Sequence, residues 1–185
     1  MAPFIFALVM DWVLRTAIPD DSRGFLLERR TSSRHNEKRI SLLAYADDLV
    51  LLASEDSKAQ EMLDNLTKAA LRVGLQINVK KTEVLSIPTG VPPQVSCMAF
   101  DGSRSQLKTS TSFKYLGGQL PNTQEDFTRR RALAWAALNK MRPIWTASNL
   151  TDKLRSSLFT AIINSILTYN AETWTFTDID FLASR

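Results

Sequence analysis

Two apolar runs of strand length, separated by a short polar break, constrain the fold of this chain most. The runs are Ile-Ser-Leu-Leu-Ala-Tyr at 40–45 and Leu-Val-Leu-Leu-Ala at 49–53, and the break between them contains Asp47 and Asp48. Two apolar strands joined by a short polar turn predict a β-hairpin. Because neither run alternates apolar with polar residues, we expect both faces of this hairpin to be buried.

The adjacent acids suggest a metal site. Two neighbouring carboxylates repel each other, and an apolar setting makes it more costly to ionise both. Mg²⁺ prefers hard oxygen ligands, and it typically takes one or two protein carboxylates together with phosphates and water. The alternative is that Asp47 and Asp48 form only a solvated turn, because Asp is a common turn residue. The metal-site interpretation requires that neither carboxylate is held in a local ion pair.

The pattern of apolar residues predicts a mixed chain. Residues 3–18 predict a helix that is apolar nearly all round, and such a helix needs cover on more than one side. A capping box of Ser57 and Gln60 predicts the start of a second helix, which Gly74 ends. Further strands are expected at 24–27, 75–79, 82–87, 95–100 and 113–120.

After Pro121 the spacing of the apolar residues becomes that of helices. One helix carries an apolar face from Phe127 to Trp145 and is ended or kinked by Pro143, and a second helix runs from about Thr151 to Tyr169. We therefore predict an α+β fold to about residue 120 and a helical region from 121 to 185.

Composition narrows the class of protein. A length of 185 residues suits one domain or two small packed subdomains, and a net charge of +4 is compatible with polyanion binding. With one cysteine and one histidine, the chain has no disulfide framework and no zinc-type ligand set, and Cys97 is expected to be a small buried apolar residue. No apolar stretch approaches the roughly 20 residues of a membrane span, and the first residues lack signal-peptide features. We expect an intracellular protein of the cytoplasm or nucleus that is not secreted.

Several ordered blocks resemble one polymerase family. Tyr45-Ala46-Asp47-Asp48 matches the Y-x-D-D signature of reverse transcriptases, with the Ala found in retrotransposon enzymes. The other blocks resemble the motif B helix at 2–10, motif D at 74–83, the motif E primer grip at 113–118, and the LINE-type thumb at 153–155 and 166–174. In the last block Asn170 stands where the family usually has Gly, and Asn tolerates the left-handed backbone.

The chain therefore resembles the C-terminal palm and thumb of an RNA-directed DNA polymerase from a non-LTR, LINE-type retrotransposon. The resemblance implies a partial palm at 1–120, an antiparallel sheet with helices on one face, followed by a helical thumb at 121–185. It implies that Asp47 and Asp48 bind Mg²⁺, and that Tyr45 and Ala46 lie near the primer end and the incoming deoxynucleoside triphosphate.

Other implied roles each have a plain alternative. Lys81 would protonate or neutralise the departing pyrophosphate, or it is a solvated lysine at the end of a strand. The primer backbone would be held by a turn that is otherwise an ordinary hairpin turn, formed by Tyr115, Leu116, Gly117 and Gly118. The duplex of RNA template and DNA primer would be contacted through its phosphates by a basic run that is otherwise a solvated helix face, formed by Arg129, Arg130 and Arg131.

The resemblance also implies missing parts. The family's motif A aspartate and its fingers precede motif B, where this sequence starts, and neither Asp11 nor Asp20 lies in a position to replace that aspartate. The two-metal site would then be incomplete, and we expect no polymerase activity from the isolated chain. The alternative function is an inactive remnant or a nucleic-acid-binding module. A retroviral enzyme fits less well, since nothing after residue 120 resembles a connection domain or RNase H.

Overall fold

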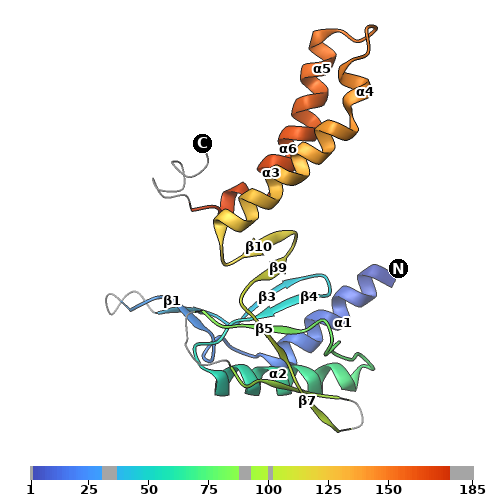
Figure 1. Ribbon diagram of the computed structural model, residues 1–185. Helices are drawn as coiled ribbons and strands as arrows, with labels where there is room; N and C mark the ends of the chain where they lie inside the picture. The colour runs from blue at the N-terminus through green and yellow to red at the C-terminus, as the bar shows by residue number, and fades with distance from the viewer. Residues whose placement is uncertain (1, 31–36, 88–92, 100–101, 176–185) are drawn as a thin grey trace. The chain divides into compact units, whose positions relative to one another are not determined.

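The computed structural model describes residues 2–30, 37–87, 93–99 and 102–175. The chain forms two compact units, Met1–Thr111 (unit 1) and Ser112–Arg185 (unit 2), which are drawn in Figure 1. The predicted α+β class is confirmed, because unit 1 mixes helices and short strands whereas unit 2 is one strand pair followed by helices. The unit boundary precedes the strands at 113–120, so the assignment of a palm to 1–120 stays a prediction.

The described residues of unit 1 form two helices and several strand pairs. The helices are α1 (Ala2–Ala17) and α2 (Asp56–Arg72). The strands are β1 (Phe25–Glu28), β2 (Lys38–Ile40), β3 (Leu42–Tyr45), β4 (Asp48–Leu51), β5 (Glu83–Leu85), β6 (Ser96–Met98), β7 (Arg104–Gln106) and β8 (Lys108–Ser110). The pairs β1–β2, β3–β4 and β6–β7 are antiparallel, whereas β5 and β8 pair in parallel, which the sequence did not predict.

The first core of unit 1 lies between the two helices. Val13 and Ala17 of α1 are buried against Leu66, Ala69 and Ala70 of α2. The alanines let the two helix backbones approach closely, because they carry the smallest side chain beyond glycine. The opposite side of α1 is exposed, so the cover expected on more than one side of this helix is present on one face only within the described residues.

The second core uses another face of α2. Leu63 packs there with Val95, Cys97 and Leu107, which come from the strand region that follows α2 in the chain. Cys97 is fully buried, as expected for a small apolar residue. One amphipathic helix thus supplies both cores of the unit.

The predicted capping box is wrong. The residue that caps α2 is Glu55, which makes no side-chain capping bond, and the Gln60 side chain faces strand β6 instead. Its Nε2 donates to the Ser96 carbonyl at 2.8 Å, and its Oε1 accepts from the Ser96 N–H at 2.8 Å. Gln60 therefore bonds both polar groups of a strand residue, as a neighbouring strand would, and this use competes with a capping role.

The segment predicted as a strand at 75–79 is not a strand. Its residues form an irregular stretch after α2, and Leu75 and Ile77 pack against the first core. Their burial on the helix pair explains the alternating apolar pattern that suggested a strand.

The backbone at Gly24, just before β1, lies close to Ile40 of β2. A Cβ at this position would collide with the Ile40 backbone, so only glycine fits there. Close by, Arg23 Nε donates to Glu61 Oε2 of α2 at 2.8 Å, and this hydrogen bond lowers the pKa of Glu61.

Unit 2 begins with the pair β9 (Phe113–Tyr115) and β10 (Gly118–Leu120) and continues with helices. The helices are α3 (Thr123–Lys140), α4 (Arg142–Trp145), α5 (Asp152–Leu158), the π-helix η1 (Phe159–Asn164), α6 (Ser165–Thr168) and the 3-10 helix η2 (Ala171–Thr173). Pro143 lies in the first turn of α4, where a missing N–H costs nothing, and α3 ends before it. The expected helix at 151–169 is present, with a π-helical centre that the sequence did not predict.

Among the described residues, no helix is both long enough and apolar enough to cross a bilayer.

We expect Gln60→Ala to destabilise unit 1 by about 1–3 kcal/mol, because it leaves the Ser96 N–H and carbonyl without their partner. The free energy of unfolding is measured in urea. Gln76→Ala is the matched control, since Gln76 is exposed, and it should change stability by less than about 0.5 kcal/mol. Equal effects of the two substitutions would contradict the bridging role of Gln60.

Candidate active site and nucleic-acid interface

The acidic pair lies at the turn of the β3–β4 hairpin. Tyr45 pairs with Asp48, so Ala46 and Asp47 form the two-residue turn between the strands. Ala46 has φ of 53°, in the left-handed region that non-glycine residues seldom adopt. Tight hairpin turns require a positive φ at their first residue, so the turn places Ala46 there and brings Asp47 to the tip.

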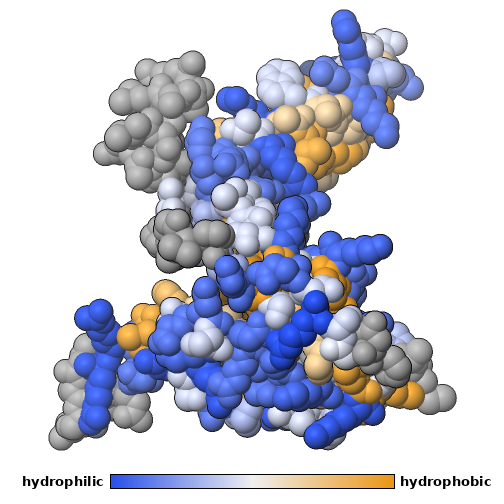
Figure 2. All heavy atoms as spheres, turned by 60° about the horizontal axis from the view of Figure 1, so that its bottom comes forward, coloured by the Kyte–Doolittle hydropathy of each residue, from blue (hydrophilic) through white to orange (hydrophobic). Residues whose placement is uncertain are grey.

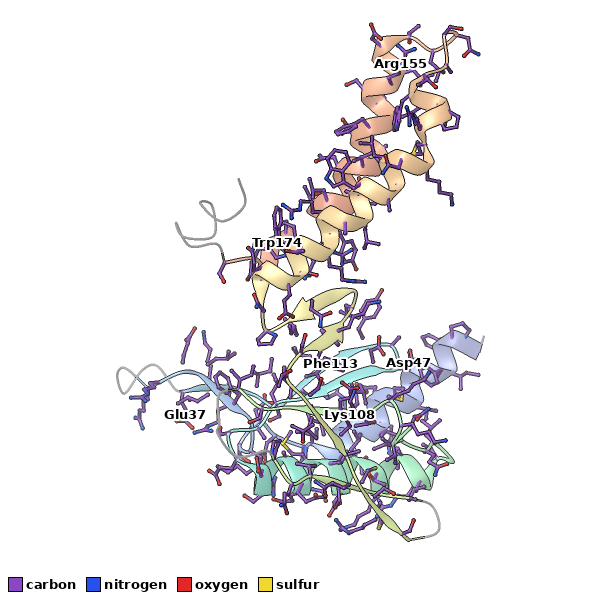
Figure 3. The ribbon with its side chains drawn as sticks, viewed as in Figure 1. Glu37, Asp47, Lys108, Phe113, Arg155 and Trp174 are labelled. Atoms are coloured by element: carbon purple, nitrogen blue, oxygen red, sulfur yellow. The ribbon has the colours of Figure 1, made fainter. Side chains whose placement is uncertain are left out.

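The predicted burial of both hairpin faces is wrong. Tyr45, Ala46, Asp47 and Asp48 are all exposed, and Figure 3 shows Asp47 at the end of the hairpin. Leu49 and Leu51 lie against the α1–α2 core on one face. A two-stranded pair that packs one face on two helices leaves the other face open, and the sequence pattern alone does not show which faces have a partner.

Neither carboxylate is used for local structure. Asp47 and Asp48 make no hydrogen bond or ion pair with any residue that the structure describes. In the same part of the chain, no three His, Cys, Asp or Glu side chains gather closely enough to hold a metal ion. Two free, exposed carboxylates match the one or two protein ligands that Mg²⁺ accepts when phosphates and water supply the rest.

Lys81 lies in a turn rather than at a strand end. The Asn78 side-chain oxygen accepts from the N–H groups of Lys80 at 3.1 Å and Lys81 at 3.3 Å. This Asx-type turn leads the chain from the irregular segment after α2 into β5. Both lysine side chains are exposed, so the turn presents them to solvent.

The predicted grip turn joins β9 to β10. Tyr115 pairs with Gly118, and the two residues between them both have positive φ, 46° at Leu116 and 88° at Gly117. Positive φ at both positions is typical of the type I′ turn that suits hairpins. Gly118 is buried, and a Cβ there would collide with the Asn170 side chain. Asn170 itself has φ of 68°, which bears out its expected tolerance of the left-handed backbone.

Three side chains of the helical region hold the carbonyls of this turn. The Tyr169 hydroxyl donates to the Leu116 carbonyl at 2.8 Å. The Gly117 carbonyl accepts from Arg129 Nη1 at 2.7 Å and from Arg130 Nη2. The Arg130 guanidinium also lies over the Tyr169 ring, 4.3 Å from its centroid. The turn is therefore fixed by hydrogen bonds from α3 and from the residue after α6.

These contacts restrict the predicted phosphate-binding run. Arg130 is buried, and a phosphate could reach it only by displacing its contacts to Gly117 and Tyr169. Arg129 is half-buried and is also bonded to the turn. Arg131 is exposed and lies 5.9 Å from the Phe127 ring centroid, so of the three it is the one on the solvated helix face.

A buried carboxylate that the sequence did not predict bonds the strand that follows the turn. Asp126 is 1% exposed, and its oxygens accept from the Gln119 N–H at 3.1 Å and the Trp174 indole N–H at 2.8 Å. Arg130 Nε lies 3.8 Å from Asp126, which is an ion pair without a direct hydrogen bond. The four-residue spacing of Asp126 and Arg130 on a helix was the available signal, since it places both on one face.

Unit 2 also exposes apolar side chains. Figure 2 shows them gathered on its helices, and the exposed residues include Leu133, Ile144, Leu154 and Phe159. An open, mostly apolar groove of about 500 Å³ is lined by residues that include Arg130, Leu133, Ile162, Ile166 and Tyr169. Arg130 and Tyr169, which bond the β9–β10 turn, thus also line an apolar surface of the same unit.

Comparison with known proteins identifies the class. Residues 1–120 match the family model of the reverse transcriptase (RNA-dependent DNA polymerase), and the chain belongs to this family. The match includes the acidic hairpin, the turn with Lys81 and the β9–β10 turn.

Two relatives carry the comparison further. A transposon-derived protein of Caenorhabditis elegans is 37% identical over 147 residues, which are 77% of this chain and 52% of that protein. The Pol polyprotein of the type-1 retrotransposable element R2 of Nasonia vitripennis is 30% identical over 124 residues, 63% of this chain and 11% of the polyprotein. The chain therefore spans about half the length of the first relative and a small part of the second.

We expect Asp126→Ala to destabilise unit 2 by about 3–5 kcal/mol, because it leaves Arg130 buried without its counter-charge and removes the acceptor of two N–H groups. Urea unfolding, followed by the fluorescence emission of Trp174 and the other tryptophans of unit 2, measures the free energy of unfolding. Asp152→Ala is the matched control: Asp152 also pairs with an arginine on its own helix, but its side chain is 97% exposed. A loss below about 1 kcal/mol for Asp126→Ala would show that the carboxylate does not anchor the unit.

Proposed function

We propose that this chain is the C-terminal palm and thumb part of an RNA-directed DNA polymerase from a non-LTR, LINE-type retrotransposon. The observation that carries the proposal is the pair of exposed carboxylates, free of local ion pairs, at a tight hairpin turn inside the family match. The relatives named for a transposon and for the R2 retrotransposable element support a mobile-element origin. Template RNA, DNA primer and deoxynucleoside triphosphates would be its partners.

Asp47 and Asp48 would hold Mg²⁺ in this proposal. When bound, such ions lower the barrier to joining a nucleotide to the primer by stabilising the attacking and leaving oxygens. Tyr45 and Ala46, beside the acids on the same turn, would contact the primer end and the incoming nucleotide. Lys81 would place a positive charge against the departing pyrophosphate, where a fixed cation acts most strongly on the transition state.

The palm in this proposal extends to residue 120 and the thumb from 121 to 185. The palm would use the β9–β10 turn to hold the primer backbone, because Gly117 and Gly118 allow a phosphate to approach the main chain. The thumb helices would contact the duplex near the sugar–phosphate backbone, which suits an RNA–DNA hybrid recognised by shape. The motif A aspartate and the fingers would come from the other part of the polymerase.

The second candidate is a nucleic-acid-binding protein without turnover. It is favoured by the observation that only two acids meet at the hairpin within the described residues, with no third ligand nearby. The two candidates share the duplex-binding surface and differ in metal binding and catalysis, so each property requires its own measurement.

Binding of Mn²⁺, a paramagnetic substitute for Mg²⁺, tests the metal site. We expect Asp47→Asn to weaken Mn²⁺ binding about tenfold or more, because one of two hard ligands loses its charge. Electron paramagnetic resonance measures the free Mn²⁺ directly. Asp56→Asn is the control, since Asp56 is an exposed acid beside another acid in the same unit. Equal binding by wild type and Asp47→Asn would remove the basis of the proposed catalytic site.

Primer extension tests the incompleteness of the site. We expect no extension of oligo(dT) on poly(rA) by the isolated chain with either Mg²⁺ or Mn²⁺, because two carboxylates alone leave the metal pair without its bridging ligand. Product that forms with the wild-type chain and disappears with Asp47→Asn would show that this expectation is wrong and that the 185 residues are sufficient for catalysis.

A further inference from the structure

Helix α3 presents a tryptophan to solvent. Trp135 is 59% exposed, although tryptophan is highly buried on average. Of the residues one helical turn away, Ala132 and Asn139 are exposed and short, and Leu138 is half-buried, so none of them is a large exposed apolar side chain. Trp135 is therefore a single exposed aromatic ring rather than the centre of an apolar patch.

An exposed cation lies on the same face of α3. Arg131 precedes Trp135 by four residues, a spacing that makes the two side chains neighbours on a helix. Arg131 makes no hydrogen bond or ion pair with any residue that the structure describes. It differs in this from Arg129 and Arg130, whose guanidinium groups bond the Gly117 carbonyl. The charge of Arg131 is therefore available to an external anion.

The surrounding chain adds positive charge and no negative charge. Residues 127–151 contain five lysines and arginines and no aspartate or glutamate. Lys140 and Arg142 are exposed, and within the described part of the chain they also form no ion pair. Cations for phosphates and a flat ring for a base are the two components with which proteins bind single-stranded nucleic acid. A stable protein interface instead has an apolar centre depleted of charge, which a lone ring beside an arginine does not provide.

This face of α3 is distinct from the side that bonds the β9–β10 turn. At 3.6 residues per turn, Trp135 lies about 120–140° around the helix from Arg129 and Arg130, which bond the turn. It lies about 160° around the helix from Leu133, which lines the apolar groove. The ring and the free cation thus face away from both the turn and the groove of the same unit.

We propose that Trp135 and Arg131 form a binding site for single-stranded nucleic acid. One unpaired base stacks on the Trp135 indole, and a phosphate of the same strand pairs with the Arg131 guanidinium. The site goes beyond the proposed function, which assigns the primer to the β9–β10 turn, and it requires neither bound metal nor catalysis. Unpaired RNA and unpaired DNA share this chemistry, so the test includes a strand of each.

Replacement of Trp135 tests the stacking. The full 185-residue chain is titrated into short fluorescein-labelled oligo(rU) and oligo(dT), and affinity is measured by fluorescence anisotropy. We expect Trp135→Ala to weaken binding about tenfold, because the stacked base loses its platform. Trp135→Phe keeps an aromatic ring, so it is expected to restore most of the affinity while removing the quenching of indole emission by the bound strand. Trp12→Ala is the matched control, since Trp12 is an exposed helical tryptophan beside the Asp11–Arg15 ion pair, and it should leave binding unchanged.

The dependence of binding on salt tests the phosphate contact. Each phosphate that a protein neutralises on a single strand contributes about 0.7 to the slope of log K against log salt concentration. We therefore expect Arg131→Gln to reduce this slope by about 0.7, because it removes one cation from the site. Trp135→Ala is expected to lower the affinity with the slope unchanged, since stacking releases no counterions. Circular dichroism of each variant verifies that the helices are intact.

The outcomes separate the single-strand site from other uses of this face. Absence of binding by the wild-type chain, or equal affinities of wild type and Trp135→Ala, would overturn the inference and leave the proposed metal site untouched. An equal loss of affinity for a blunt RNA–DNA hybrid in Trp135→Ala would assign the face to duplex binding and also overturn it. A change in sedimentation of Trp135→Ala without nucleic acid would identify a protein interface instead. Selective loss of single-strand affinity supports the site, and the ratio of oligo(rU) to oligo(dT) affinity then shows which strand it prefers.

Discussion

The packing of α2 is the constraint on which unit 1 depends. One face of this helix buries Leu66, Ala69 and Ala70 against α1, and another buries Leu63 against the strand region after it, while Gln60 bonds the backbone of β6. The short strand pairs are too small to be stable alone, because isolated two-stranded pairs are marginal in water. The acidic hairpin keeps its place because Leu49 and Leu51 rest on the helix pair. The hairpin tip can then expose two carboxylates without using them for its own stability.

In unit 2 a buried polar group, rather than an apolar helix face, joins distant parts of the sequence. The carboxylate of Asp126, fully buried, accepts hydrogen bonds from β10 and from Trp174 and lies beside Arg130, so residues far apart in the sequence meet at one acceptor. The side chains around it fix the carbonyls of the β9–β10 turn. Structural and functional polar groups are thus separated: the acid that stabilises the fold is buried and bonded, whereas the acids proposed to bind metal are exposed and unbonded.

Local signals in the sequence predicted local structure well. The hairpin around Asp47, the helices at 3–18 and 151–169, the buried Cys97 and the left-handed Asn170 follow from turn chemistry and periodicity. The failures concern tertiary partners, which local patterns do not reveal: the hairpin and the first helix each have cover on one face only within the described residues, and other segments bond to distant ones. Gln60 bonds a strand about three dozen residues away instead of capping its helix, and 75–79 packs on helices instead of joining a sheet. Site roles for Asp48, Lys81 and Tyr115 stay predictions.

The close approach of the backbone to Gly24 restricts how this sequence can diverge. Any side chain at this position would collide with the Ile40 backbone, so a protein that must stay folded retains glycine there. Asp47 is exposed and unbonded, and an exchange at such a surface position changes stability by no more than about 0.5 kcal/mol. If the chain comes from a mobile element, as proposed, copies that lose Asp47 but retain Gly24 would be those maintained for their fold without catalysis, and drift at both positions would mark copies under no selection.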